Sequence, residues 1–344
     1  MTMPIGRPTL LSRCASIVSI GLLLGACAHG APGPDPVVVK RAQMQMGTIV
    51  TLTAVASDEA TGQRALTAGF QEVRRLEQLL STWIPASELS QVNRAAGQAP
   101  VTVSDETWTV VSRSLEIAAL TDGAFNIAVG PAVEAWSVTE RQRIPDEAEL
   151  ERLRPAIDLR QVQLDRQART IYLARPEMRL DVGGIGKGYA ADRVEVVMRQ
   201  AGALGGVVAL AGDIKTFGRL PGGKPFPFAI RHPRKPDEVL AFVDLQDEAI
   251  STAGDYERFF ERDGVRYHHI LDPRTLQPAR ACQSVTVVAK EGVMADGLDT
   301  GIFVLGPERG MALVERLPDV EAVIVDDTGR VLVSSGLQGR VRFP

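Results

Sequence analysis

The chain contains few cysteines and few aromatic residues, and it has no long run of basic residues. Only 3 of its 344 residues are cysteine, and Phe, Trp and Tyr together make up 5%. The 38 Lys and Arg residues are balanced by 42 Asp and Glu residues, which leaves a net charge of −4 and argues against a nucleic-acid-binding protein. Hydrophobic residues (45%) and charged residues (23%) are close to globular averages, which excludes a disordered, collagenous or coiled-coil protein.

The N-terminus has the pattern of an export signal. Arg7 and Arg13 form a basic segment, and the apolar run 15–26 is too short to span a bilayer as a helix. The run ends in small residues directly before Cys27, as bacterial lipoprotein cleavage sites do. We expect cleavage there and a lipid-bearing Cys27 that anchors the protein to a membrane. The alternative is an ordinary secretory signal in which Cys27 has this place by chance.

The rest of the chain divides into a short tether and one large domain. Residues 1–27 are predicted to be a lipoprotein signal peptide, residues 28–40 a tether and residues 41–344 the folded domain. Cys14 lies in the signal, so Cys282 is the one thiol left in the domain and no internal disulfide can form. We expect Cys282 to be a buried small apolar residue rather than a nucleophile.

Predicted strands and helices alternate irregularly along the domain, which indicates an α+β fold rather than a regular βαβ series. Leu66, Phe70 and Val73 recur at spacings of three and four and predict a helix over residues 58–80. The other expected helices lie between Ser104 and Gly123 and at 143–154, 189–200, 294–305 and 307–317. The expected strands are 48–55, 162–164, 170–173, 179–182, 206–211, 226–230, 239–243, 265–271 and 284–289, with a hairpin around 326–330.

A cluster of oxygen ligands is predicted on the helix at 294–305. Asp296, Asp299 and Thr300 stand at positions i, i+3 and i+4, so the three side chains can share one face. Two carboxylates and a hydroxyl are hard ligands that suit Mg²⁺ or Ca²⁺ rather than Zn²⁺. The helix continues into an apolar segment, so the carboxylates are expected to be buried and to need a partner such as a cation. The alternative is that the two Asp residues only cap a helix N-terminus.

A glycine-rich turn at 183–188 lies between a predicted strand and a predicted helix. Glycines there let backbone N–H groups approach a phosphate, the helix N-terminus favours negative charge, and Lys187 adds a positive charge. The segment is not a Walker A motif, because Asp181 stands in place of the first Gly and Gly188 in place of Ser or Thr. It is not a Rossmann fingerprint either. The alternative is a tight turn with a purely structural role.

Two further segments have polar groups next to predicted strand ends. His269 and Asp272 lie where a strand turns, and a titratable His at such a place can act as a general base. A structural role for the neighbouring pair His268 and His269 is the alternative. For the segment 251–256, which follows a strand, we expect a solvated loop.

Taken together, these segments resemble the ApbE-like family of FAD:protein FMN transferases. The matching segments run in the family's order and cover roughly residues 44–306. They are 46–48, 81–93, 121–131, 181–192, 211–213, 251–256, 269–275 and 295–306. Each motif is weak alone, whereas the ordered set is specific.

The resemblance implies an α+β fold of mixed, largely antiparallel sheets with packed helices, and an enzyme that uses FAD and Mg²⁺. Such an enzyme transfers the FMN moiety of FAD to a Thr or Ser hydroxyl of another protein and releases AMP. Asp296, Asp299 and Thr300 would bind Mg²⁺ with the backbone carbonyl of Gly184, and His269 and Asp296 would be catalytic, with His269 beside the phosphates. The residues expected to contact the flavin nucleotide are Met46, Trp83, Ala124, Phe125, Asn126, Asp181, Lys187 and Ile270.

The resemblance also implies partners and a place in the cell. Family members modify subunits of membrane redox complexes at a short Thr/Ser motif, so the expected partner is an acceptor protein of this kind. With lipid on Cys27, the expected location is the periplasmic side of the inner (cytoplasmic) membrane. No nucleic-acid partner is expected.

The chain departs from the family pattern at three positions, and other functions remain open. Asn126 stands where Asp is frequent, Gly184 where Ala is common, and Leu276 where Gly is usual, so the turn before Leu276 is expected to differ. One alternative function is a Mg²⁺-dependent FAD pyrophosphatase that yields FMN and AMP. The others are a periplasmic flavin-binding protein and a structural envelope lipoprotein.

Overall fold

Strand β1 (Val37–Gln45) is the first element of the structure, a computed structural model that describes residues 35–344. The predicted signal peptide, the lipid on Cys27 and tether residues 28–34 lie outside the described residues. Because β1 already begins at Val37, the fold starts a few residues before the predicted boundary at 41. Within residues 35–344, no helix has both the length and the apolar character needed to cross a membrane.

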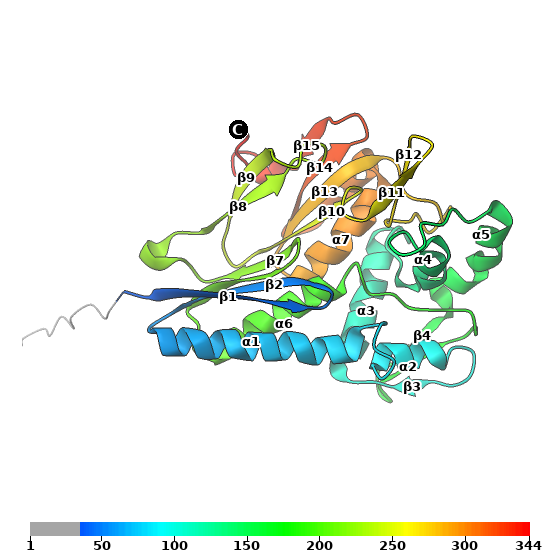
Figure 1. Cartoon of the computed structure of the whole chain (residues 1–344), viewed down its shortest axis with the longest axis horizontal. Helices are drawn as coiled ribbons and strands as arrows, with labels where there is room; N and C mark the ends of the chain where they lie inside the picture. The colour runs from blue at the N-terminus through cyan, green and yellow to red at the C-terminus, as the bar shows by residue number, and fades with distance from the viewer. Residues whose placement is uncertain (1–34) are drawn as a thin grey trace, which may run out of the picture. The chain divides into compact units, whose positions relative to one another are not determined.

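An 8-stranded sheet runs through the molecule in the order β1-β2-β6-β7-β10-β13-β14-β15 (Figure 1). Each neighbouring pair of these strands is antiparallel, which confirms the predicted α+β fold with largely antiparallel sheets. The strands after β1 are β2 (Thr48–Ala56), β6 (Gly205–Leu210), β7 (Asp213–Phe217), β10 (Ala249–Gly254), β13 (Cys282–Ala289), β14 (Val320–Asp326) and β15 (Val331–Val333).

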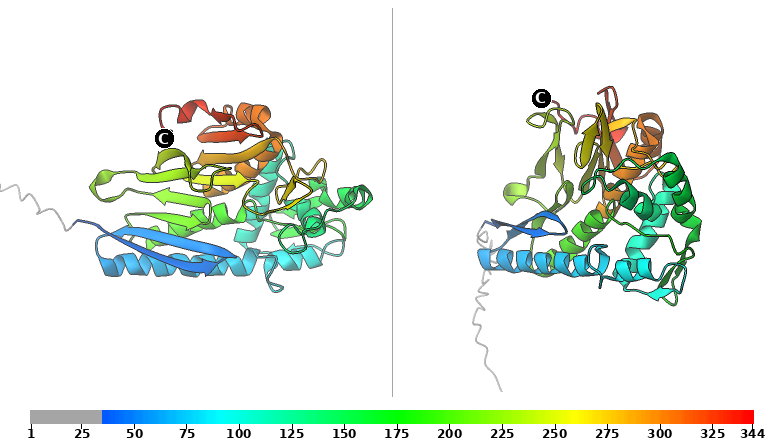
Figure 2. Two further views of the ribbon diagram at one scale, coloured as in Figure 1. Left: turned by 45° about the horizontal axis from the view of Figure 1, so that its top comes forward. Right: turned by 45° about the vertical axis from the view of Figure 1, so that its right-hand side comes forward.

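Four helices cover one face of this sheet. They are α1 (Glu59–Leu80), α6 (Gly186–Gln200), α7 (Gly292–Leu305) and α8 (Pro307–Val314). Helix α1 begins after Asp58, whose carboxylate accepts the N–H of Thr61 (2.8 Å), and its apolar face packs against the β1–β2 hairpin (Figure 2). Helices α6, α7 and α8 follow it across the sheet, with α7 against β10 and β13.

The strand register decides which polar side chains face these helices. Ala249 of β10 pairs with Lys215 of β7, and Ile250 pairs with Ile214. Side chains alternate along a strand, and both isoleucines belong to the apolar cluster on the opposite face. Asp213 and Ser251, which lie one residue further along β7 and β10 on the other side of each strand, therefore point toward the helices.

The opposite face of the sheet is covered over β10, β13 and β14 by a two-stranded hairpin. Its strands are β8 (Phe226–Arg231) and β9 (Val239–Leu245). Ala241 and Val243 of β9 are fully buried against Ile250 and Val288 of the large sheet. The hairpin gives the molecule a second apolar core on the side away from the helices.

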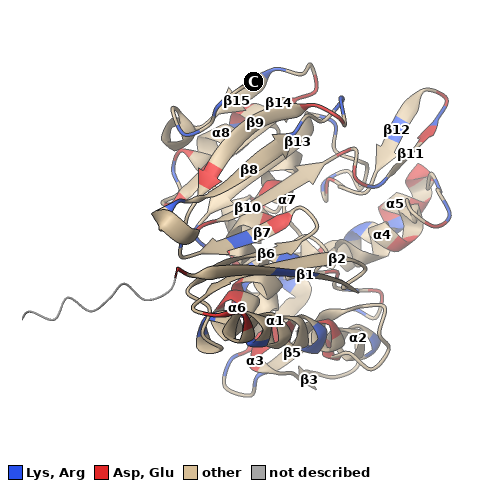
Figure 3. Ribbon diagram, turned by 60° about the vertical axis from the view of Figure 1, so that its left-hand side comes forward, with Lys and Arg blue, Asp and Glu red and all other residues tan. Residues whose placement is uncertain are grey.

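The remaining elements form a region beside the helical layer; some of them contribute to the main core, and others share a separate apolar cluster around the fully buried Trp136. Both positive and negative residues lie on the surface of this region (Figure 3). Its helices are α2 (Glu88–Arg94), α3 (Asp105–Leu120), α4 (Gly130–Trp136) and α5 (Glu147–Leu153). Its strands are β3 (Val101–Thr102), β4 (Val162–Asp165), β5 (Thr170–Leu173), β11 (Phe259–Arg262) and β12 (Val265–His268).

Most expected elements are present within a few residues of their predicted ends, but the predicted strand at 179–182 is wrong. The backbone of Leu180 bonds instead to the side chain of Asn93, which accepts the N–H (2.7 Å) and donates to the carbonyl (2.9 Å). The N–H of Asp181 donates to the carbonyl of Ile127 (2.7 Å). A buried amide side chain thus replaces a neighbouring strand as the hydrogen-bond partner.

One other expectation about local structure is also wrong, and the turn before Leu276 has a defined shape. The segment 251–256 is not a solvated loop, because Ser251 to Gly254 belong to β10 and Ser251 is 2% exposed. The turn before Leu276 keeps a shape that suits glycine: Leu276 has a φ of 60° and its N–H donates to the carbonyl of Asp272 (2.7 Å). The leucine side chain is fully buried beside Trp136, and this burial offsets the cost of a left-handed backbone.

Candidate active site

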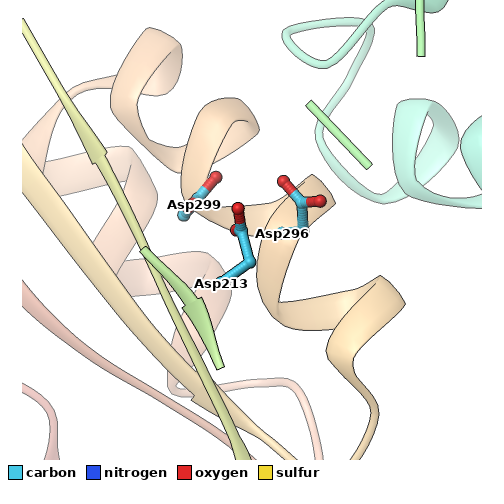
Figure 4. A group of neighbouring side chains, drawn as sticks. All are labelled: Asp213, Asp296 and Asp299. Atoms are coloured by element: carbon cyan, nitrogen blue, oxygen red, sulfur yellow. The ribbon is translucent and has the colours of Figure 1, made fainter. Parts of the chain in front are cut away.

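Three carboxylates converge between β7 and α7. Asp213 is the first residue of β7, and Asp296 and Asp299 lie on α7; one oxygen of each lies within 4.8 Å of the others. Figure 4 shows the three side chains directed toward one another from the strand and the helix. Each is buried, with 3–5% of its surface exposed. Like charges this close repel strongly in a weakly polar interior, so the cluster requires positive charge nearby.

Two hydroxyl groups adjoin the carboxylates. The Ser251 hydroxyl lies 2.6 Å from Asp299 Oδ2 and also within hydrogen-bond distance of Asp213 Oδ1. A hydroxyl has one proton, so it can donate to only one of these carboxylates at a time. The Thr300 hydroxyl donates to Asp299 Oδ1 (3.1 Å). These bonds reduce the repulsion between the carboxylates without removing it.

The start of α6 supplies positive charge next to the three carboxylates. The ammonium group of Lys187 forms an ion pair with Asp213, and the N–H of Gly188 donates to Asp296 Oδ2 (2.7 Å). The N-terminus of a helix has a partial positive charge, which favours the ionised carboxylate of Asp296. The glycine-rich turn was expected to approach a phosphate; in the structure, the N–H of Gly188 is directed at a carboxylate.

The pKa values of these groups reflect the excess of negative charge. Burial, followed by the charge of Asp213, raises the pKa of Asp296 to about 7. Burial and the charge of Asp296 raise the pKa of Asp299 well above its usual value. Burial alone would lower the pKa of Lys187, but the carboxylates of Asp213 and Asp296 outweigh it and raise that pKa. One lysine against three carboxylates leaves a charge that a proton or a cation must neutralise.

Backbone contacts between α6 and α7 fix the position of the carboxylates. A Cβ atom on Gly188 would lie 2.1 Å from the carbonyl oxygen of Gly292, so the two helices cross closer than a side chain allows. Asp192, one turn further along α6, accepts the N–H groups of Gly292 (2.7 Å) and Val293 (2.9 Å). It therefore caps the N-terminus of α7 from a neighbouring helix, because α7 has no side-chain cap of its own.

Gly184 and Thr300 are neighbours, as the expected ligand set requires. A Cβ atom on Gly184 would lie 3.2 Å from Thr300 Oγ1 and 3.5 Å from the ring of Phe125. Phe125 and Ala124 are buried, with 3% and 2% of their surfaces exposed. Asp181 accepts the N–H of Gly183 (2.7 Å) and so shapes the turn before Gly184.

The side chain of Asn126 makes two hydrogen bonds to the backbone of the fold. Its oxygen accepts the N–H of Ala128 (2.7 Å), and its nitrogen donates to the carbonyl of Ile157 (3.0 Å). The predicted contact with the flavin nucleotide would have to spare these two bonds. Ile270, another predicted contact, is 4% exposed and packs in the main core.

Met46 and Trp83 both lie near the C-terminal end of α1. Met46 is at the tip of the β1–β2 hairpin with a φ of 49°, and its N–H donates to Glu77 Oε1 (2.8 Å). Trp83 follows α1 and is 79% exposed. An exposed indole offers a flat apolar surface for a planar ring. The predicted flavin contacts of these two residues stay predictions.

The two neighbouring histidines differ in their surroundings. His268 is 2% exposed; its Nε2 donates to the carbonyl of Ala279 (2.7 Å) and its Nδ1 accepts the N–H of Ile270 (3.3 Å). Nδ1 of His269 is 3.3 Å from the carbonyl of Arg258, which assigns the proton to Nδ1 and leaves Nε2 with a lone pair. Desolvation, followed by the charge of Arg258, lowers the pKa of His269 to about 3, so the ring is neutral near pH 7.

Two residues of this site have no role among the sequence-based predictions. Asp213 lies in the matching segment 211–213 without a predicted role, and Ser251 was expected in a loop. Asp213 follows Ala211 and Gly212 in a tight turn between β6 and β7, and Ala211 has a φ of 57°. An acidic residue at the start of a strand, directly after such a turn, is a sequence signal from which Asp213 could be predicted as a site residue. Recognising Ser251 also requires the register of β10 against β7, which the sequence alone does not provide.

Cysteine and the departures from the family pattern have simple structural explanations. Cys282 is 3% exposed, which confirms that it is buried, and burial raises the pKa of its thiol to about 12. The backbone carbonyl of residue 184 is present whether the residue is Gly or Ala. The ring of Phe125 lies beside the place that a Cβ atom would take.

Two relatives that are similar to most of this chain have the same name. The "FAD:protein FMN transferase" of Treponema pallidum (strain Nichols) is 35% identical over 96% of this chain and 95% of its own length. The protein of the same name from Klebsiella pneumoniae (strain 342) is 33% identical over 87% of this chain and 92% of its own length.

Solved structures show the same fold. The ApbE protein of Thermotoga maritima matches 88% of this chain and 99% of its own, with a TM-score of 0.82 and 28% identity. The flavin transferase ApbE of Vibrio cholerae matches 89% of this chain and 99% of its own, with a TM-score of 0.78 and 30% identity. The sequence model of the ApbE family matches residues 46–324, so the carboxylates, Lys187 and His269 all lie inside the matched region, and the chain belongs to the ApbE family.

Proposed function

We propose that this chain is an FAD:protein FMN transferase that works at a magnesium site formed by α7, β7 and the turn before α6. The observation that carries this proposal is the group of three buried carboxylates with a single lysine. The relatives bear the name of this activity over nearly the whole length of the chain. The chemistry requires a site that neutralises a diphosphate, and a buried carboxylate cluster fits a cation that would do so.

The residues present fit a hard divalent cation. Asp296, Asp299 and Thr300 offer oxygen atoms from one face of α7, and the carbonyl of Gly184 adjoins Thr300. Asp213 adds a third carboxylate within reach. Oxygen donors of this kind suit Mg²⁺. When bound, the ion would neutralise charge on the diphosphate of FAD.

The chain's own groups would orient FAD and the incoming hydroxyl. The ammonium of Lys187, now paired with Asp213, is the side-chain cation next to the carboxylates within residues 35–344 and is suited to a phosphate oxygen. The exposed Trp83 offers aromatic surface for the isoalloxazine ring, with Met46 nearby, and the buried Phe125 would support the turn at Gly184 from behind. Asp181 would hold the turn before Gly184 in place.

His269 would accept the proton of the attacking hydroxyl. Its pKa of about 3 keeps Nε2 unprotonated near pH 7, and Nδ1 is held by Arg258. The hydroxyl oxygen of the acceptor forms a bond to the FMN-side phosphorus, and the bond from that phosphorus to the bridging oxygen breaks. AMP leaves with the bridging oxygen, and the hydroxyl proton passes to Nε2 of His269.

The acceptor and the location follow as part of the same proposal. The acceptor is a protein with a Thr or Ser in a short flavinylation motif, a subunit of a membrane redox complex. Lipid on Cys27 would hold the enzyme on the periplasmic face of the inner membrane, beside such a complex.

The test is a reaction of the purified protein with FAD, Mg²⁺ and a candidate acceptor, followed by mass spectrometry. A gain of one FMN on a single Thr or Ser of the acceptor, with release of AMP, is the expected result. Rapid release of FMN and AMP without any acceptor would assign the site to hydrolysis of FAD. Binding of FAD that then stays intact with every acceptor and cation would make the chain a flavin-binding protein.

A further inference from the structure

A second charged site lies at the far end of β10 from the carboxylates. It is a cavity of about 190 Å³, and we name it the arginine pocket. Its charged lining consists of three arginines and two aspartates, alongside one buried histidine. The lining residues used below are Arg234, Arg266, Arg280, Asp255, Asp327 and His268.

The arginines of this pocket are held in place by their neighbours. Asp255, which is 8% exposed, accepts two hydrogen bonds of 2.7 Å from Arg234 and lies 3.5 Å from Arg266. Arg280 donates to the backbone carbonyl of Arg266 and lies over the ring of Tyr267 (5.5 Å). Each guanidinium has five N–H donors, so several donors remain for a ligand.

Of the three guanidinium groups that line the pocket, two are paired with carboxylates and one is not. Arg234 and Arg266 contact Asp255, Arg266 also pairs with Glu261 outside the lining (3.1 Å), and His268 has a lowered pKa and adds no charge near pH 7. Arg280 forms no ion pair with a carboxylate of residues 35–344. On a chain with a net charge of −4, such a pocket selects a negatively charged group. Guanidinium groups bind carboxylates and phosphates best, because both offer two oxygens in one plane.

The pocket lies where it can contact the acceptor polypeptide rather than the reacting phosphates. Ser251 and Asp255 are four residues apart at the two ends of the same extended segment, about 13 Å from each other at roughly 3.3 Å per residue. His269 lies near Lys187, whereas His268, the next residue, lines the pocket. A protein whose hydroxyl reaches the carboxylates extends several residues to each side, so its flanking residues pass within reach of the pocket.

We propose that the arginine pocket is a second binding site, which takes a carboxylate of the acceptor protein and holds the acceptor while its hydroxyl reacts. The proposal rests on the proposed transferase function. The same chemistry would also take free inorganic phosphate, so the experiment has to separate these two sources.

The test compares Arg280→Ala with the full-length enzyme in steady-state transfer. Arg280→Ala is expected to raise the KM for the acceptor by about tenfold or more, since charge-assisted hydrogen bonds to a carboxylate are lost. The KM for FAD and kcat at saturating acceptor should stay unchanged. Arg280→Lys should restore part of the affinity, because it keeps the charge and loses the paired donors. Arg262→Ala is the matched control, because Arg262 lies on the neighbouring strand β11 and bonds to the carbonyl of Gln142.

Replacing acceptor carboxylates one at a time by amides identifies the ligand. One such acceptor variant should raise KM with the full enzyme and have no further effect with Arg280→Ala. Inorganic phosphate should compete with the acceptor for the full enzyme and much less for Arg280→Ala.

Three outcomes would overturn the proposal. An unchanged acceptor KM in Arg280→Ala, with phosphate still bound at the pocket, would make it a site for free phosphate only. A raised KM for FAD would assign the pocket to the nucleotide. A melting temperature that falls together with kcat would make Arg280 a structural residue. Failure of the full enzyme to transfer FMN to any acceptor would instead contradict the proposed function, and the two failures are therefore distinguishable.

Discussion

The two ends of β10 differ in the sign of the charge that lacks a partner. Around Ser251, three carboxylates face one lysine; around Asp255, Arg234 and Arg266 are paired with carboxylates, whereas Arg280 is not paired with one in residues 35–344. The carboxylates of the first group are 3–5% exposed, whereas the side chains of Arg234 and Arg266 are 37% and 26% exposed. Unpaired charge costs much more in the interior than at the surface. Both ends suit a ligand of opposite charge, but only the buried end needs that ligand for stability.

The largest effect is expected from Asp299→Asn, which removes one charge from the buried end. Transfer should fall by about a hundredfold or more, because a ligand oxygen and its charge are lost. Without Mg²⁺, the melting temperature of the variant should be equal to or higher than that of the parent, because repulsion with Asp213 and Asp296 is reduced. Thermal melting with and without Mg²⁺ and a transfer assay measure both effects.

Asp319→Asn is the control for this substitution. Asp319 is an exposed aspartate that pairs with Lys290 and does not belong to the cluster, so both the stabilisation by Mg²⁺ and the activity should persist. An Asp299→Asn protein that is still stabilised by Mg²⁺ to the full extent would contradict the cation assignment.

The cation ligands that spacing predicts are those that lie on one helix. Asp296, Asp299 and Thr300 follow from a spacing of three and four residues, which the chain itself fixes. Asp213 and Ser251 are brought in by two strands whose register depends on pairing over long distances in sequence. The same reason explains the wrong strand at 179–182, where Asn93 supplies the hydrogen bonds from 87 residues away.

The fold class could be predicted because it follows from local patterns in the sequence, whereas the arginine pocket could not be predicted. Apolar periodicity and turn residues are local properties, and they placed most helices and strands. Arg234, Arg266 and Arg280 come from three separate segments and have no common spacing. Only the folded chain brings them around Asp255, so composition and motif could not reveal a cluster of guanidinium groups at this place.

His269→Ala tests the histidine near Lys187. Transfer should slow by about a hundredfold, because the hydroxyl would lose its proton acceptor. The affinity for FAD should change little, since the carboxylate cluster and Lys187 are intact. His268→Gln is the matched control: it keeps a donor for Ala279 and should retain turnover. A His269→Ala enzyme with normal turnover would remove this residue from the mechanism.

Asp192→Ala tests whether the cap from α6 fixes the carboxylates. The N–H groups of Gly292 and Val293 would lose their acceptor, so the free energy of unfolding should fall by about 2 kcal/mol. Because α7 also holds Asp296 and Asp299, the Mg²⁺ concentration for half-maximal activity should rise. Both are measured by urea unfolding and by Mg²⁺ titration of the transfer rate.

A second capping residue provides the comparison. Asp146 caps the exposed helix α5 through the N–H of Glu149 (2.7 Å), so Asp146→Ala should cost about 1 kcal/mol without any change in Mg²⁺ dependence. Equal effects of both variants on Mg²⁺ dependence would show that α7 does not depend on the contact with Asp192.

The last effect concerns pH and the histidine that lines the arginine pocket, and it leaves the transfer reaction itself unchanged. Desolvation lowers the pKa of His268 to about 4, whereas an unfolded chain has a His pKa of about 6.5. The unfolded state therefore binds more protons between these values, and stability is complete above about pH 6.5 and falls as the pH drops toward 4. Between pH 7 and 5 this one group should remove roughly 2 kcal/mol from the free energy of unfolding. In His268→Gln this part of the loss should disappear, because glutamine does not titrate. Urea unfolding of both proteins at the two pH values measures the difference, and identical losses would mean that His268 gains its proton without unfolding.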